Sequence, residues 1–276
     1  MNIKEALNKG LPLLEGLEYI NPHNECRNIL SYLLQKDTSY LFAHSDEELP
    51  KEVSEEFFKI INKRQKGYPL QYILGSTEFF GRNFKVNENV LIPRQDTEIS
   101  VENILKVIES DKLKSMLDIG TGSGIVAITV KLETGIETYA CDISRKALEV
   151  SMENAKNLEA NVNFIESDLF KNINKKFDII YSNPPYIKSK IINTLQIEVK
   201  DFEPKLALDG GEDGLYFYKK IIKDASQHLN KNGYLIFEIG HDQAEEIENL
   251  MEDRFNTQVI KDLSNLDRVI VGKMRG

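Results

Sequence analysis

The sequence has no tryptophan, only two cysteines and no long run of apolar residues. Cys26 and Cys141 lie far apart and not at metal-ligand spacing, which favours buried free thiols over a disulfide framework or a zinc site. No apolar run approaches the ~20 residues that span a bilayer, and the first residues lack the order of a signal peptide. These absences predict a cytoplasmic protein with no membrane contact.

A basic surplus is also missing, because 35 Lys and Arg stand against 44 Asp and Glu for a net charge of −9. Proteins that hold a nucleic acid backbone normally present a basic face. We therefore expect no direct nucleic acid partner, and interpret the lysines clustered between Lys171 and Lys190 as a solvated rim. A chain of 276 residues is long enough for a large and a small domain.

Helical periodicity dominates the beginning of the chain. Four leucines from Leu7 to Leu17 recur at helical spacing, and Glu55–Arg64 has the pattern of a further helix. Turn residues such as Asn21-Pro22 separate these segments. The pattern predicts a small helical bundle over residues 1–68. Its acidic-to-neutral helices and separate core favour a role in docking a substrate.

The pattern then changes over residues 69–94. Short strand-like pieces around Gly81-Arg82 predict a hairpin or an extended linker. Asp96 is expected to cap a helix that runs from Thr97 to about Ser110. Residues 95–276 are predicted to form the catalytic domain.

Within residues 95–276, strand and helix patterns alternate, which predicts an α/β fold with a mostly parallel sheet covered on both faces. The last two strands, joined by a short turn, are expected to pair antiparallel at one edge. The predicted strands are Ser115–Ile119, Glu137–Cys141, Val162–Ile165, Phe177–Tyr181, Tyr234–Ile239, Thr257–Ile260 and Arg268–Val271. The predicted helices between them are Ile125–Glu133, Ser144–Leu158, Leu215–Leu229 and Gln243–Arg254.

A glycine-rich turn, Gly120-Thr121-Gly122-Ser123-Gly124, follows the first strand of this sheet. Glycines there permit positive φ and let a ligand approach the backbone closely, and ligands of such sheets sit at the carboxyl ends of strands. The spacing departs from the dinucleotide fingerprint, because its third glycine would fall at Ile125. A tight strand-to-helix turn without a ligand is the alternative.

Acidic residues end the next two strands. Asp142 lies about twenty residues beyond the first glycine, where a carboxylate can accept from ribose hydroxyls; a helix cap shared with Ser144 is the alternative. Asp168 can accept from the amine of adenine and Leu169 can pack on the ring, although such an Asp also serves as a turn residue. Three markers at successive strand ends together predict a nucleoside-like cofactor.

Asn183-Pro184-Pro185-Tyr186 follows the fourth predicted strand. Consecutive prolines stiffen the segment, which fixes the separation between the Asn183 side-chain oxygen and the Pro184 carbonyl. Two such acceptors match the two N–H donors of a planar NH₂ group, and Tyr186 can lie against its flat face. A simple strand terminator is the alternative. With the cofactor markers, the segment predicts methyl transfer from S-adenosylmethionine to an amide or amino nitrogen, with acceleration from in-line geometry and the two preorganised acceptors.

These motifs resemble the protein-(glutamine-N5) methyltransferases that modify peptide chain release factors. The resemblance also rests on four further segments, which are Ile92–Glu98, Glu203–Leu208, Gly210–Leu215 and Phe237–Gly240 with Gln243 following. It implies a Rossmann-like class I methyltransferase domain and a substrate glutamine in the Gly-Gly-Gln tripeptide of a release factor. It assigns Gly120–Gly124, Asp142 and Leu169 to the cofactor, and Asn183 to Tyr186 to the glutamine. Gln95 stands where the family usually has proline, and Leu169 where it often has an aromatic residue.

Two other functions remain open from the residues. An adenine-N6 methyltransferase would use the same Asn-Pro-Pro-Tyr loop, but it is expected to carry a basic recognition region. A catalytically silent cofactor-binding scaffold would dock its partner through the helical bundle. The intact Asn183–Tyr186 loop favours catalysis over the scaffold.

Overall fold

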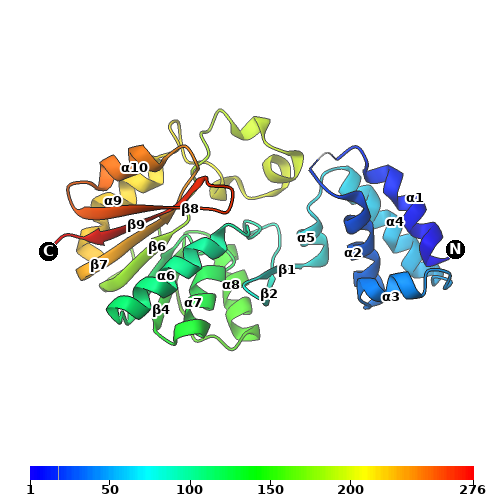
Figure 1. Cartoon of the computed structure of the whole chain (residues 1–276), viewed down its shortest axis with the longest axis horizontal. Helices are drawn as coiled ribbons and strands as arrows, with labels where there is room; N and C mark the ends of the chain where they lie inside the picture. The colour runs from blue at the N-terminus through cyan, green and yellow to red at the C-terminus, as the bar shows by residue number, and fades with distance from the viewer. Residues whose placement is uncertain (18) are drawn as a thin grey trace. The chain divides into compact units, whose positions relative to one another are not determined.

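A computed structural model describes residues 1–17 and 19–276 (Figure 1). The chain folds into two compact units. One consists of Met1–Gly75 with Gln196–Phe202, and the other of Ser76–Leu195 with Glu203–Gly276. The functional division into 1–68, 69–94 and 95–276 stays a prediction.

The first unit is a helical bundle, as the periodicity predicts. Its helices begin at polar caps: the side chain of Asn2 accepts from the Glu5 backbone N–H at 2.8 Å and that of Asp37 from Tyr40 at 2.8 Å. Asn21 caps the second helix, whose first residue is a proline. The helices are α1 (Ile3–Leu14), α2 (Pro22–Leu34), α3 (Thr38–Ala43), α4 (Lys51–Gln65) and α5 (Leu70–Leu74).

The buried face of α1 differs from the expected row of leucines. Ile3, Ala6, Gly10 and Leu14 are buried, whereas Leu7 and Leu11 pack only partly against the core. The reason is a close helix–helix approach, because a Cβ on Gly10 would lie 3.0 Å from the Phe57 ring on α4.

Arg64 joins the distant segment Gln196–Phe202 to this bundle. Its guanidinium is 1% exposed and donates to Glu25 at 2.7 Å, to Glu198 at 3.0 Å and to the Tyr68 carbonyl at 2.6 Å. The two carboxylates raise the pKa of Arg64 against the opposing effect of burial. A buried cation with three acceptors fixes the segment in place, since removal of any partner leaves buried charge uncompensated.

The second unit is built on a seven-stranded sheet of order β5-β4-β3-β6-β7-β9-β8. Its first five strands pair in parallel, and β9 pairs antiparallel with both β7 and β8. The predicted mostly parallel sheet with an antiparallel edge is therefore confirmed. The strands are β3 (Ser115–Ile119), β4 (Glu137–Asp142), β5 (Asn163–Glu166), β6 (Phe177–Ser182), β7 (Leu229–Glu238), β8 (Phe255–Lys261) and β9 (Asp267–Met274).

Helices cover both faces of this sheet (Figure 1). One apolar cluster packs the sheet against α6 (Thr97–Asp111), α7 (Ile125–Thr134) and α8 (Arg145–Asn157). The other packs the opposite face against α9 (Tyr216–His228) and α10 (Ala244–Met251). This layered order brings the carboxyl ends of β3, β4 and β6 to one edge, with the β3–β6 pair as the switch point.

Two local expectations differ from the structure. The stretch over residues 69–94 contains the predicted hairpin, formed by β1 (Ser76–Phe79) and β2 (Arg82–Lys85), but it also contains helix α5, which the sequence pattern does not predict. Asp96 stands before α6, but its side chain makes no cap hydrogen bond and instead pairs with Arg268 at 3.1 Å. An arginine within reach competes with the backbone for this carboxylate.

Helix α7 offers a matched test of close packing. Gly124 and Gly135 flank it with φ of +82° and +71°, but a Cβ on Gly124 would lie 2.9 Å from Ser151 Cβ and 2.9 Å from Ile128 Cδ1, whereas Gly135 has open space. We expect Gly135→Ala to cost about 1 kcal/mol of unfolding free energy through φ strain, and Gly124→Ala at least about 2 kcal/mol more through overpacking. Urea unfolding of both variants measures this difference, and equal losses would contradict it.

Candidate functional site

A cavity of about 420 Å³ opens at the carboxyl ends of β3, β4 and β6. That volume lies within the range of small-molecule sites, roughly 300–1,000 Å³. The predicted site residues that line it are Gly120, Thr121, Gly122, Ser123, Asp142, Asp168, Leu169, Asn183, Pro184 and Pro185. The structure thus brings both predicted halves of the site to one cavity.

The glycine turn and Asp142 form one hydrogen-bonded corner of the cavity. Gly120 and Gly122 have φ of +72° and +56°, and nothing lies within 4 Å of the Cβ position of either. One Asp142 oxygen accepts from the Gly122 N–H at 3.0 Å and the other from the Ser144 N–H at 2.8 Å. A carboxylate has about four acceptor positions, so Asp142 keeps capacity for ribose hydroxyls. The contact with Ser144 is therefore present, and the ribose contact stays a prediction.

Gly124 has a different role from the other two glycines. Gly124 is not one of the described residues that line the cavity. It stands at the start of α7, where it permits close packing against Ser151 of α8. The fit to a nucleoside-like ligand therefore rests on Gly120 and Gly122, beside the carboxylate of Asp142.

Asp168 and Leu169 line the cavity after β5. Leu169 has a φ of +51°, an uncommon conformation for a branched residue. Its carbonyl accepts from the Ser167 hydroxyl at 2.7 Å, and its side chain packs against the core cluster of that face. This anchoring places an aliphatic surface at the cavity wall, where a flat ring can lie against it.

Asn183, Pro184 and Pro185 line the cavity directly after β6. The last residue of that strand, Ser182, pairs with Ile119 of β3, and its hydroxyl donates to the Ile119 carbonyl at 2.7 Å. This bond ties the start of the loop to the strand that carries the glycine turn. The distance between the two halves of the site is therefore set by the sheet itself.

Tyr186, by contrast, does not appear among the described lining residues, and it packs against the core cluster. Burial raises the pKa of its hydroxyl, which keeps the side chain neutral. Its predicted contact with the flat face of a substrate stays a prediction.

Gly210, Gly214 and Gln243 contact the backbone of the Asn-Pro-Pro-Tyr loop. A Cβ on Gly210 would lie 2.7 Å from the Pro185 carbonyl oxygen, and one on Gly214 would lie 2.5 Å from that of Tyr186. The Gln243 amide donates to the carbonyls of Tyr186 at 3.3 Å and Gly214 at 3.2 Å. Glycine is required at 210 and 214 because any side chain would displace the Asn-Pro-Pro-Tyr loop.

The sequence reasoning missed Asp118, which lines the cavity from within β3. Its carboxylate is 2% exposed and accepts from the Thr121 hydroxyl at 2.6 Å. Burial raises the pKa of Asp118 to about 7, although the Thr121 bond opposes this shift. A charged residue within an apolar run was the available signal, since Asp118 follows Met116 and Leu117 of β3. Glu238 of β7 carries the same signal, because it directly follows an apolar run that ends at Phe237.

Comparison with known proteins gives two family models for this chain. "PrmC N-terminal domain" matches residues 5–75, and "Methyltransferase small domain" matches residues 93–200. A release factor glutamine methyltransferase of Koribacter versatilis is 37% identical over 99% of this chain and 99% of its own length. That of Clostridium acetobutylicum is 38% identical over 100% of both chains.

Solved structures share the fold. A methyltransferase from Pyrococcus furiosus superposes with a TM-score of 0.54 and covers 71% of this chain and 90% of its own, at 21% identity. The seven-stranded sheet with helices on both faces is therefore a methyltransferase fold.

The buried carboxyls predict how stability depends on pH. Asp118 and Glu238 have pKa values raised from 3.8 and 4.5 to about 7, so the folded state binds their protons more tightly than the unfolded state. The stability that they contribute is complete at low pH and is lost as pH rises through about 7. Carboxyls with a lowered pKa, such as Asp178, change the free energy of unfolding only below about pH 4.

We therefore expect the free energy of unfolding to fall by a few kcal/mol between about pH 5 and about pH 8, since one unit of pKa is worth about 1.4 kcal/mol. Asp118→Asn, which keeps an acceptor for Thr121, should reduce this decline. Urea unfolding at several pH values measures both slopes. An unchanged slope in the variant would contradict the assignment.

Proposed function

Because the chain belongs to the release factor glutamine methyltransferase family, we propose that it transfers a methyl group from S-adenosylmethionine to the side-chain amide nitrogen of a release factor glutamine. The acceptor is the glutamine of the Gly-Gly-Gln tripeptide. Nearly full-length similarity to such enzymes supports this. The single structural observation that carries it is the shared cavity, which the glycine turn, Asp142 and the Asn183–Pro185 segment line together.

The cofactor half of the cavity has the donor and acceptor set that S-adenosylmethionine needs. Asp142 would accept from the ribose hydroxyls, Asp168 would accept from the adenine amine, and Leu169 would pack on the adenine ring. The open backbone at Gly120 and Gly122 admits the ligand close to the turn. When bound, the cofactor supplies a methyl group already activated on a sulfonium.

The substrate half holds the glutamine amide by its two hydrogens. Asn183 Oδ1 and the Pro184 carbonyl each accept one N–H, which fixes the nitrogen and directs its lone pair toward the methyl group. The amide nitrogen would take the methyl group, the electron pair of the broken S–C bond would stay on the leaving sulfur, and the nitrogen would release one proton to water. Pro184 is buried and the loop is held by Gln243, so the acceptors are preorganised.

Neither a metal site nor a membrane helix enters this proposal. Over residues 1–17 and 19–276, no group of side chains could hold a metal ion. In the same ranges, no helix is both long and apolar enough to cross a bilayer. A cytoplasmic location and the absence of a nucleic acid partner, which the charge of −9 favours, belong to the proposal as well.

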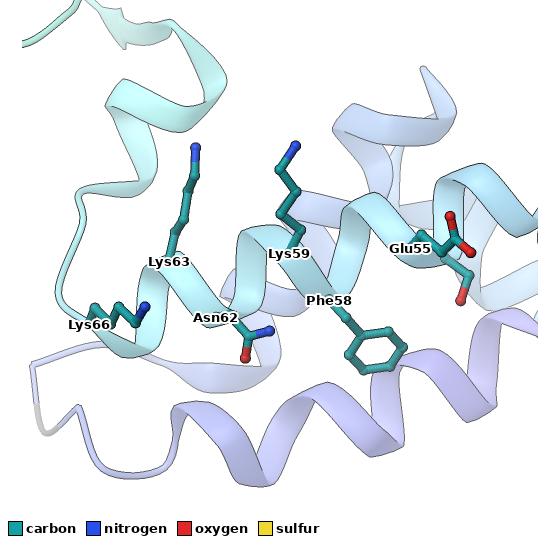
Figure 2. A pocket seen from close by; sticks show the side chains of 7 residues that line it. Glu55, Phe58, Lys59, Asn62, Lys63 and Lys66 are labelled. Carbon is teal, nitrogen blue, oxygen red and sulfur yellow. The ribbon is translucent and has the colours of Figure 1, made fainter.

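The N-terminal unit, we further propose, contacts the release factor outside the glutamine pocket. It has its own hydrophobic core and matches a family model of its own. A hollow of about 560 Å³ lies along α4, and Figure 2 shows Lys59 and Lys63 extending in parallel beside it. Glu55, Phe58 and Lys66 also line it, so the surface carries three lysines, one carboxylate and one aromatic side chain.

Replacement of the first acceptor tests the chemistry. We expect Asn183→Ala to lower kcat by about a hundredfold or more while S-adenosylmethionine affinity stays within about threefold. Asn161→Ala, an exposed asparagine outside the cavity, is the matched control. Mass spectrometry of purified release factor and of duplex DNA, offered separately, locates the methyl group. Transfer to DNA alone, or unchanged transfer by Asn183→Ala, would refute the proposal.

Charge reversal on α4 tests the docking role. We expect Lys59→Glu/Lys63→Glu to raise KM for full-length release factor about fivefold or more with kcat unchanged. KM for a short peptide that contains Gly-Gly-Gln should stay the same. Lys4→Glu/Lys9→Glu on α1 makes the same charge change on another exposed surface and is the control. Equal KM shifts in both double variants would remove the specific role of α4.

A further inference from the structure

Glu238, the last residue of β7, is a buried carboxylate without a role in the reaction described above. It is 2% exposed and is not among the described residues that line the cavity. In the parallel β6–β7 pair, Ser182 lies opposite Phe237, so Asn183 and Glu238 are the next residues along each strand. Asn183, which lines the cavity, is therefore the neighbour of Glu238 across this strand pair.

The contacts of Glu238 constrain which end of the Asn183 amide faces it. Hydrogen bonds from the side chains of Thr97 and Asn183 lower the pKa of the Glu238 carboxylate, and the Tyr181 hydroxyl donates to it at 3.5 Å. An ionised carboxylate can only accept, so Asn183 must present its NH₂ group to it. Because the amide is planar with oxygen and nitrogen on opposite sides, Oδ1 then faces the cavity.

We propose that Glu238 is the positioning residue of Asn183, whose amide it holds with Oδ1 directed at the substrate nitrogen. The inference rests on the proposed function. A protonated Glu238 is itself a donor and would take Oδ1 as its acceptor. The amide would then present an NH₂ group to the substrate NH₂ group, which removes one of the two acceptors.

The surroundings allow Glu238 to change charge near neutral pH. Burial raises its pKa to about 7, while Thr97, Arg268 and Asn183 oppose the shift. Arg268 is paired with Asp96 at 3.1 Å and Asp262 at 3.0 Å. The titratable groups that face Glu238 are Tyr181 of β6, Tyr186 of the loop, Tyr218 of α9, Asp96 before α6 and Arg268 of β9. Burial raises the pKa of all three tyrosines, so they stay neutral.

Glu238→Gln tests the inference in the full-length enzyme with S-adenosylmethionine and purified release factor. We expect kcat at about pH 8 to fall about tenfold to a hundredfold, because the Gln side chain can donate to Asn183 Oδ1 as well as accept from its NH₂ group and therefore no longer fixes the orientation of that amide. KM for the release factor and cofactor affinity should stay within about twofold. The wild-type kcat should rise between about pH 6 and about pH 8, and this rise should be absent in the variant. The thermal midpoint at about pH 8 should equal or exceed that of wild type, because the neutral amide removes a buried charge.

Tyr218→Phe is the control for a merely structural role. Its hydroxyl donates to the backbone carbonyl of Glu238 at 2.8 Å, and not to the carboxylate that is proposed to hold Asn183. We expect this variant to lower the thermal midpoint while kcat and its pH dependence stay as in wild type. The opposite pattern in the two variants separates positioning from stability.

Three results would overturn the inference. The first is a Glu238→Gln enzyme with wild-type kcat and pH profile, and the second is a joint loss of cofactor affinity and thermal midpoint. The third is a wild-type kcat that does not change between about pH 6 and about pH 8. This result would refute the inference even if the Glu238→Gln variant does not fold. A rise that persists in Asp118→Asn, whose carboxyl also has a pKa of about 7, supports Glu238. A wild-type enzyme without any transfer to release factor would refute the proposed function itself.

Discussion

The pairing of β3 with β6 is the constraint on which the site depends. It places the glycine turn and the Asn183 loop at adjacent strand ends. The hydrogen bond from the Ser182 hydroxyl to the Ile119 carbonyl fixes the distance between the two strands where the loops begin. Methyl transfer needs two reactants at a defined separation and angle. Here the separation is set in the interior of the sheet, since the further parallel strands β4 and β7 flank β3 and β6. The loops after these two strands then need only to present their polar groups to the cavity. Gln243, Gly210 and Gly214 contact the backbone of the Asn183 loop and hold it in place.

Much of this arrangement follows from sequence patterns alone. The strand–helix alternation, the glycine turn, Asp142 and the Asn-Pro-Pro-Tyr loop are local signals, and the alternation predicts a mostly parallel sheet whose ligands lie at the carboxyl ends of its strands. The order of the strands was not predicted. Gly124 was grouped with the cofactor turn because its spacing alone does not reveal that Ser151 packs against it. The same holds for Asp96, whose partner Arg268 is remote in the sequence. Long-range partners decided each of these cases, and a single sequence does not display them.

Buried carboxyls mark the active region more strongly than its surface charges do. Asp118 and Glu238 are both 2% exposed, in strands that otherwise carry apolar side chains at their centres. Burying such groups opposes stability near neutral pH. Natural cores keep polar groups of this kind where a specific geometry is required. The sheet therefore combines a tightly packed apolar interior with a few ionisable groups at the edge where the chemistry occurs.

The bond between Arg64 and Glu198 has a consequence for how the chain is made. The N-terminal bundle includes Gln196–Phe202, a segment synthesised long after its helices. Before that segment has been synthesised, Arg64 can pair with Glu25 and the Tyr68 carbonyl but lacks Glu198. The bundle is the first part to be translated, yet it reaches its final structure only when most of the catalytic sheet has been translated. Two units that look separable along the sequence are thus coupled in the order of their folding.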